Sequence, residues 1–180
     1  MSLVESLELL GKRFSVAIYS SERPYFDVLI DTILYFLKKR NNQLVCLTLE
    51  HGAYDIQTRL GKEGIEEGIF FVDPVSVMND KGLPYGDFDL INNPELVDDM
   101  WVSILVNVRE ARKKGETTVI FYYISELVKY IGIDNALFFL NAVLKQLKEQ
   151  GINTVLVTGV KDDSLQKTIF NGLVNKIIYV

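Results

Sequence analysis

The turn that joins the first predicted strand to the first predicted helix carries the residues most open to a chemical interpretation. It reads Ser-Ser-Glu-Arg-Pro at 20–24, between a β-branched and aromatic run at 14–19 and an apolar helical pattern that continues to about residue 40. A loop at this place can cradle phosphates through glycines with positive φ, a lysine and a hydroxyl that binds magnesium. This turn has no glycine and no lysine. Its Glu22 puts a carboxylate where an anion would lie, a repulsion of about 4 kcal/mol per unit charge at 4 Å and an effective dielectric constant near 20.

The same turn leaves an alternative open, in which it holds a nucleotide or another anion without cleaving it. The N-terminus of any helix carries a partial positive charge. Ser20, Ser21 and Arg23 could complete an anion cradle around it. We therefore expect no triphosphate hydrolysis at this turn and keep anion binding as the second hypothesis.

Glu50 and His51 follow the next apolar run, at 43–49, and are the other candidates for chemistry. His51 is the only histidine, so any Ser-His-Asp triad would have to use it. Ser20 and Ser21 lack the flanking glycines of a nucleophile elbow. We expect His51 to be a solvated loop residue and Glu50 an ordinary polar residue at the end of a strand. An enzyme that combines these two residues with aspartates of a long loop is a third, weaker hypothesis.

That long loop covers 73–93 and contains four aspartates. Carboxylates suit calcium or magnesium, but the spacing here fits no known metal-binding loop, and aspartate and glycine are common in turns. We expect no metal site and no bound cofactor. The four aspartates are Asp73, Asp80, Asp87 and Asp89.

Apolar strand patterns alternate with helical ones along the chain, which predicts a mainly parallel sheet with helices on both faces. A continuous apolar run such as 43–49 is typical of a strand that is buried on both faces. We expect a single three-layer α/β/α domain over residues 1–180, with about six strands. The predicted strands cover 14–19, 43–49, 68–72, 117–123, 152–158 and 176–180, and the predicted helices cover 4–10, 24–40, 53–60, 93–114, 125–132, 134–150 and 164–171.

Composition and charge argue against several classes of function. The formal net charge is −5 and the pI is near 5.0, which disfavours attraction to nucleic acid. A single cysteine, Cys46, allows neither an internal disulfide nor a cysteine metal site. No apolar run approaches the roughly 20 residues that span a bilayer, and no signal peptide pattern is seen. We expect a cytoplasmic protein that does not contact membranes.

Adjacent aromatic pairs occur at 70–71, 122–123 and 138–139 and bear on possible partners. On a helix, neighbouring side chains point about 100° apart. Phe138 and Phe139 therefore cannot both lie at the centre of one buried stripe. One of them could be an interface residue, although we favour a wide arc that faces the core.

The order and texture of these elements resemble the KaiC-like branch of the RecA-type P-loop ATPases over nearly the whole chain. Residues 45–50, Val-Cys-Leu-Thr-Leu-Glu, are similar to the second strand of that family with its catalytic glutamate, and residues 53–61 are similar to the helix that follows and ends in Leu-Gly. Residues 119–122 resemble the strand that carries the magnesium-holding aspartate, and residues 140–158 resemble the helix and strand beyond it. The resemblance implies a RecA-like fold of a degenerate, archaeal-type member. It places Glu50 at the catalytic position.

The resemblance also places Tyr122, or its neighbour Tyr123, where the family has its aspartate. A phenol is neutral at pH 7 and is a poor ligand for magnesium. With the phosphate loop also absent, we expect a non-catalytic domain that acts as a protein-binding or regulatory module. RecA-type cores typically assemble side by side, so the resemblance implies a protein partner, either a second copy of this chain or an active ATPase relative. The residues of the vestigial site would be Ser20, Ser21, Arg23, Glu50, His51 and Tyr122.

Overall fold

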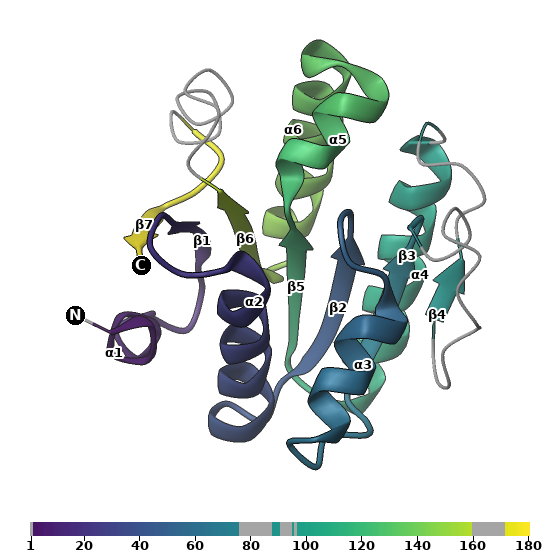
Figure 1. Cartoon of the computed structure of the whole chain (residues 1–180). Coiled ribbons are helices and arrows are strands. Elements are labelled where there is room, and N and C mark those ends of the chain that lie inside the picture. The colour runs from purple at the N-terminus through teal and green to yellow at the C-terminus, as the bar shows by residue number, and fades with distance from the viewer. Residues whose placement is uncertain (1, 76–87, 91–94, 96, 160–171) are drawn as a thin grey trace.

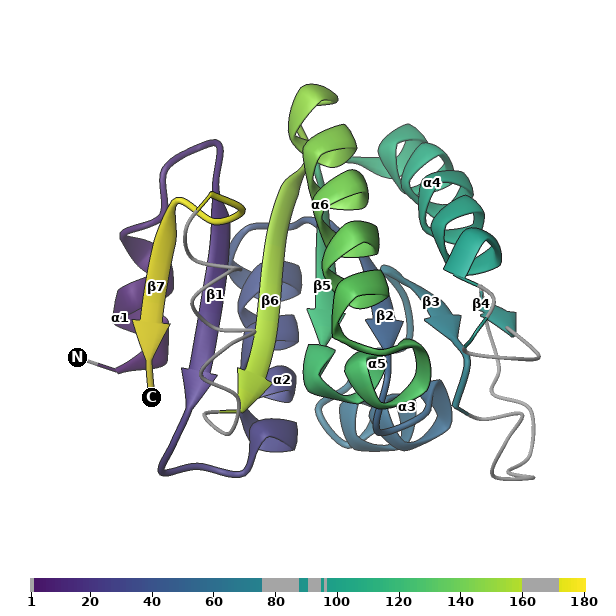
Figure 2. The ribbon, with the colours of Figure 1, turned by 90° about the horizontal axis from the view of Figure 1, so that it is seen from above.

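The computed structural model describes residues 2–75, 88–90, 95, 97–159 and 172–180. Its centre is a sheet of seven strands in the order β4-β3-β2-β5-β6-β1-β7 (Figure 1). All neighbouring pairs are parallel, so the strands share one carboxyl end and one amino end, as their arrows show in Figure 2. The strands are β1 (Ser15–Ser20), β2 (Gln43–Thr48), β3 (Ile69–Asp73), β4 (Phe88–Leu90), β5 (Thr117–Tyr122), β6 (Asn153–Gly159) and β7 (Lys176–Tyr179).

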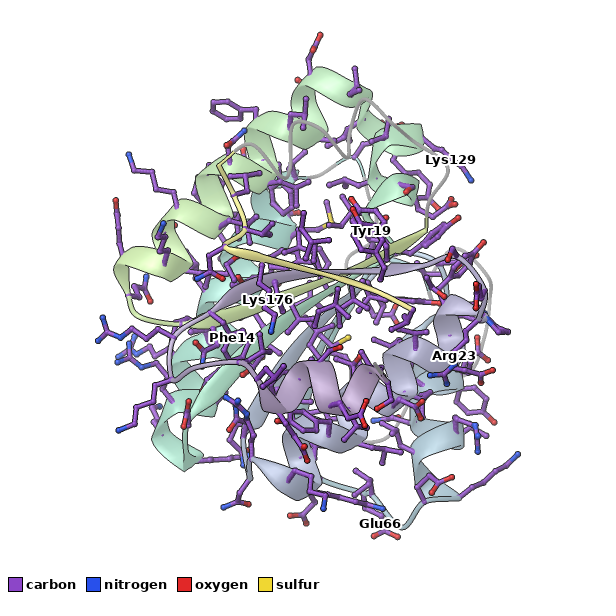
Figure 3. All side chains as sticks on the ribbon, turned by 90° about the vertical axis from the view of Figure 1, so that its left-hand side faces the viewer. Phe14, Tyr19, Arg23, Glu66, Lys129 and Lys176 are labelled. Atoms are coloured by element: carbon purple, nitrogen blue, oxygen red, sulfur yellow. The ribbon has the colours of Figure 1, made fainter. Side chains whose placement is uncertain are left out.

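Helices cover both faces of the sheet, which confirms the predicted three-layer α/β/α architecture. The two layers lie above and below the sheet in Figure 3, where the sheet is seen nearly edge-on. Within the described ranges, no helix is long and apolar enough to cross a lipid bilayer. One layer holds α1 (Leu3–Glu8), α2 (Tyr25–Leu34) and α3 (Ala53–Gly61), and the other holds α4 (Val97–Lys114), α5 (Ile124–Ile131) and α6 (Ile133–Glu149).

Strand β2 is a continuous apolar run because it is buried on both faces. Val45 and Leu47 pack into the core beneath α4 and α6, whereas Leu44 and Cys46 pack into the core beneath α2 and α3. Because both faces of the strand are covered, alternation between polar and apolar residues is lost. The Cys46 thiol is fully buried, and burial raises its pKa, so it stays a protonated core group.

The helical segment after β1 ends near Arg40, as predicted, although its last turn is a π-helix (Tyr35–Lys39). The Arg40 guanidinium donates to the carbonyl oxygens of Leu10 at 2.6 Å and Gly11 at 3.2 Å. It also lies over the ring of Phe14, 5.4 Å from the ring centroid. This one cation therefore satisfies carbonyl groups just beyond the end of α1 and joins α1 to α2.

Strand β4 was not predicted. It pairs with β3 from Phe71↔Phe88 to Asp73↔Leu90, inside the stretch at 73–93 that the sequence indicated as irregular. Three residues are too few to form a recognisable strand pattern among the surrounding glycines and prolines. Asp80, Asp87 and the helix predicted at 164–171 lie outside the described residues.

At the amino end of the sheet, Asn153 ties three strands together. Its side-chain oxygen accepts the N–H of Phe14 at 3.0 Å. Its amide nitrogen donates to the carbonyl oxygen of Lys12 and to the carboxylate of Glu116, each at 3.2 Å. Asn153 is buried, so one side chain fixes the segments that lead into β1 and β5 against the start of β6.

Candidate functional site at the carboxyl end of the sheet

The turn between β1 and α2 is short, and contacts within the protein already use its polar groups. The buried Ser20 hydroxyl donates to the carbonyl oxygen of Arg23. The Ser21 N–H donates to the carbonyl oxygen of Val180, just beyond β7, at 2.8 Å. Pro24 has no N–H and lies at the N-cap, so α2 begins one residue later than predicted. A phosphate loop instead turns successive N–H groups toward its ligand.

Arg23 binds the helix that follows it. Its Nη2 lies 2.6 Å from Asp31 Oδ2, and both side chains are 42% exposed. Figure 3 shows Arg23 near the rim of the molecule. The polar groups of Ser20, Ser21 and Arg23 therefore contact three different partners, and the structure does not gather them into the predicted anion cradle.

Aromatic rings fill the space beside this turn. The ring of Tyr25 stacks on Tyr123 with centroids 4.6 Å apart, and the Tyr123 hydroxyl donates to the Tyr25 hydroxyl at 3.4 Å. The ring of Phe26 lies against His51, with centroids 4.5 Å apart. We call Tyr25, Phe26, His51, Tyr122 and Tyr123 the aromatic layer. It joins the start of α2 to the ends of β2 and β5.

The backbone around Tyr123 is adapted to this layer. Tyr123 has φ 57° and ψ 62°, a left-handed conformation that costs a non-glycine residue about 1–2 kcal/mol. Its N–H donates to the carbonyl oxygen of Val157 at 2.7 Å, which holds the strained residue in place. At the end of β6, a Cβ on Gly159 would lie 3.2 Å from the ring of Tyr25 and 3.4 Å from the ring of Tyr123. Glycine at this position therefore lets the rings approach the sheet.

Within the layer, Tyr122 links Glu50 to His51. The Tyr122 hydroxyl lies 2.9 Å from His51 Nδ1 and 3.3 Å from Glu50 Oε2, although its one proton can be donated to only one of them at a time. The Tyr122 side chain is fully buried. Burial, with a smaller effect from the Glu50 carboxylate, raises the pKa of Tyr122, so the phenol stays protonated at physiological pH and acts as a donor.

This arrangement corrects the expectation for His51. The sequence indicated a solvated loop histidine without a partner, but its ring contacts those of Phe26 and Tyr122, and its side chain is 36% exposed. Glu50 lies at the carboxyl end of β2, as predicted, and has a hydrogen-bond partner there. The structure thus brings together Glu50, His51 and Tyr122 from the predicted vestigial site.

The aromatic layer lies where an open parallel sheet usually binds ligands. The chain leaves β2 toward α3 on one face and leaves neighbouring β5 toward α5 on the other. Two neighbouring strands with connections to opposite faces create a crevice at their carboxyl ends. In this protein the residues at that position are Glu50 and His51 after β2 and Tyr122 and Tyr123 at the end of β5, and their side chains contact one another.

Asp73, the first aspartate of the long loop, has a structural role. Its buried carboxylate accepts the N–H of Ala53 at 2.6 Å, at the start of α3, and the N–H of Val75 at 2.8 Å. A carboxylate in this position satisfies free donors at the N-terminus of a helix. Within the part of the chain that the structure describes, no three His, Cys, Asp or Glu side chains gather as a possible metal site.

Sequence reasoning missed Tyr25 and Phe26 as part of this site. Both follow Pro24 directly, so their position at the start of a helix could be predicted. Their ring partners could not be predicted, because Tyr25 and Tyr123 are 98 residues apart in the chain. The pairing depends on the strand order, which places β1 and β5 on either side of β6.

Comparison with known proteins places the fold. No protein-family model and no curated protein matches the sequence. Among solved structures, the chain is similar to a KaiC-like protein from the hyperthermophilic archaeon Pyrococcus horikoshii, with 15% identity, a TM-score of 0.63, and coverage of 92% of this chain and 70% of that chain. It is also similar to an uncharacterised protein from Pyrococcus horikoshii in complex with an unknown peptide, with 13% identity, a TM-score of 0.66, and coverage of 98% and 81%. These likenesses confirm the predicted KaiC-like, RecA-like α/β fold.

Proposed function

We propose that this chain is a non-catalytic KaiC-like module that binds another protein and does not hydrolyse ATP. The observation that carries the proposal is the occupied turn between β1 and α2. The hydroxyl of Ser20, the N–H of Ser21 and the guanidinium of Arg23 are all engaged by other groups of the protein. A triphosphate would have to displace these contacts without a lysine or a glycine-rich loop to compensate.

The aromatic layer supports the same conclusion from the side of the metal. Magnesium prefers oxygen ligands with negative charge. Tyr122 offers a phenol that is kept neutral by burial, and its hydrogen goes to Glu50 or His51. The nearest ring stack, Tyr25 on Tyr123, offers no charged oxygen, and its hydroxyls bond to each other. Glu50 is left with a structural partner and no triphosphate to act on.

The likeness to solved structures also bears on the kind of partner. One of the similar proteins was crystallised with an unknown peptide. At 13% identity this likeness shows a shared fold, and the peptide is a property of that protein. It motivates the choice of a protein partner for this chain, either a second copy or another protein.

Titration with nucleotide tests the proposal. With about 1 mM Mg-ATP or Mg-ADP, we expect a change in melting temperature below about 1–2 °C and no saturable heat of binding. A ligand whose dissociation constant exceeds its concentration stabilises the folded state by less than about 0.4 kcal/mol. Phosphate release should equal the blank, and Glu50→Gln should not change it. A RecA-type ATPase with an intact phosphate loop, run in parallel, is the positive control.

The outcomes separate the hypotheses. Magnesium-dependent phosphate release that Glu50→Gln abolishes would overturn the proposal in favour of an enzyme. Saturable nucleotide binding without phosphate release, weakened by Arg23→Ala, would support the anion-binding alternative instead. Sedimentation velocity over a range of protein concentrations would then show whether a second copy of the chain is the partner.

A further inference from the structure

A hollowed surface extends from the amino end of the sheet along α6. It consists of adjoining hollows of about 400, 270, 280 and 380 Å³. The first two share Lys148 and Leu173, the second and third share Arg13, and the third and fourth share Arg112. Because neighbouring hollows have common walls, we treat them as one surface and call it the basic groove.

The basic groove gathers about half of the described lysines and arginines that form no ion pair with another described residue. Six exposed cations line it against one carboxylate, that of Glu116, and none of the six forms an ion pair with another described residue. The groove therefore has a formal charge of +5, and since the chain totals −5, the remaining residues carry −10. Figure 3 shows nitrogen-tipped side chains on the side where Phe14 is labelled. The six cations are Lys12, Arg13, Arg109, Arg112, Lys145 and Lys148.

Helix dipoles explain only part of this charge. Arg112 and Lys148 lie in the last turns of α4 and α6, where cations are favourable. Lys12 and Arg13 precede a strand, so no helix end accounts for them. The Asn153 side chain binds the carbonyl oxygen of Lys12, and a Cβ on Gly151 would lie 3.8 Å from the Arg13 guanidinium. The backbone at Lys12 is thus tied to β6, and the Arg13 guanidinium lies close to the turn that follows α6.

One end of the groove is apolar. Phe138 is 73% exposed on α6, whereas its neighbour Phe139 is 1% exposed in the core. The sequence favoured a shared core arc for this pair, and the structure instead places Phe138 on the surface. Phe138, Ala142 and Leu173 line the hollow of about 400 Å³, with Lys145 and Lys148 beside them. An apolar side chain can therefore be buried a few ångströms from two cations.

We propose that the basic groove binds an acidic amphipathic segment of a partner protein. Apolar side chains of the segment pack on Phe138, and its carboxylates pair with Lys148, Arg13 and Arg112. Opposite charge gives specificity and speeds association, while an aromatic residue that becomes buried in the contact adds affinity. Nucleic acid fits less well, because the groove has an apolar end and the rest of the chain is strongly negative. The proposal rests on the proposed function, of which it names the docking surface and the chemistry of the partner.

Fluorescence anisotropy with a defined peptide tests the charge of the groove. The probe is a labelled peptide of about 15 residues with Asp and Glu on one helical face and Leu and Phe on the other, in about 50 mM salt. We expect its amide version, with Asn and Gln for Asp and Glu, to bind at least about tenfold more weakly. We expect a similar loss for the double variant Arg13→Glu/Arg112→Glu. The matched control Lys39→Glu/Lys62→Glu makes the same change in net charge at exposed positions elsewhere and should alter affinity less than about twofold.

The apolar end is tested separately. Phe138→Ala should weaken binding of the acidic peptide by about tenfold, as expected when an aromatic side chain that packs against the partner is removed. The control is Tyr54→Ala, which removes a 46% exposed ring on α3 and should change affinity less than about twofold. We expect each variant to fold, because the substituted side chains are exposed, and circular dichroism checks this.

Several results would overturn the proposal. Equal binding of the acidic and amide peptides, or no binding of either, would show that carboxylates of the peptide do not pair with the groove. Equal losses of affinity in the groove variant and the control variant would show that binding depends on the net charge of the protein and not on the groove. Tighter binding of an oligothymidylate of the same charge, with the same dependence on Arg13 and Arg112, would assign the groove to nucleic acid. None of these variants lies in the β1–α2 turn, so the nucleotide titration still tests the proposed function when the groove fails.

Discussion

The two ends of the parallel sheet present opposite surfaces. At the carboxyl end, rings from α2, β2 and β5 pack together, a neutral phenol joins Glu50 to His51, and Arg23 is paired with Asp31. At the amino end, adjoining hollows of 270 to 400 Å³ are lined by cations that no described carboxylate pairs with. The end at which α/β proteins usually bind ligands is thus filled. The end that usually serves stability is open and charged.

The direction of the helices bears on this difference between the two ends. Helices that follow parallel strands point their N-termini to the carboxyl end, which favours anions. Here the first turns of these helices contain acids of the chain itself, Asp27 in α2, Asp55 in α3 and Glu126 in α5. The chain has therefore used its own carboxylates where a phosphate would be favourable. At the other end of the sheet, the basic groove has six cations without an ion-pair partner among the described residues.

The largest expected effect tests whether the carboxyl end is truly filled. Tyr122→Ala should lower the free energy of unfolding by about 4 kcal/mol, because it empties a fully buried position in the aromatic layer and removes the partner of His51 and Glu50. Urea unfolding measures this. Phe138→Ala, on the exposed face of α6, is the contrasting variant and should change stability by no more than about 0.5 kcal/mol. A loss below about 1.5 kcal/mol for Tyr122→Ala would mean that the layer is loosely packed.

The second test moves to the amino end. Asn153→Ala should cost about 2 kcal/mol, because the buried N–H of Phe14 loses its acceptor and the turn at Lys12 loses its tie to β6. Asn141→Ala is the matched control, since the exposed Asn141 amide donates to the Leu137 carbonyl within its own helix, α6. Equal stability of the two variants would show that Asn153 does not organise this end.

The third test measures how the stability of the wild type and of a tyrosine variant depends on pH. Burial raises the pKa of Tyr122 and, with the neighbouring Tyr25, that of Tyr123. Above about pH 10, tyrosines in the unfolded chain release protons that the folded chain retains, so stability falls as pH rises. Tyr122→Phe removes one such group, and its stability should fall less steeply by up to about 1.4 kcal/mol per pH unit. Parallel curves for variant and wild type would contradict the raised pKa.

The architecture could be predicted because it depends on local patterns. The apolar run of β2 indicated burial on both faces, and the last turns of α4 and α6 carry the basic residues that a helix end favours. The same reasoning located Glu50, His51 and Tyr122 at strand ends. It failed for contacts between distant segments. The stack of Tyr25 on Tyr123 and the clustering of Arg13 with Arg112 follow from strand order, which no local pattern specifies.

The smallest expected effect separates the paired cation of one end from the unpaired cations of the other. Arg23→Ala should change stability by about 0.5 kcal/mol or less, because its ion pair with Asp31 is half exposed and a cation near the start of α2 opposes the helix dipole. Arg59→Ala removes a comparably exposed pair with Glu63 and should behave alike. Both effects should vanish in about 1 M salt. A loss of more than about 1.5 kcal/mol in the free energy of unfolding for Arg23→Ala alone would show that the β1–α2 turn depends on this cation. A cation would then be important for the carboxyl end of the sheet as well.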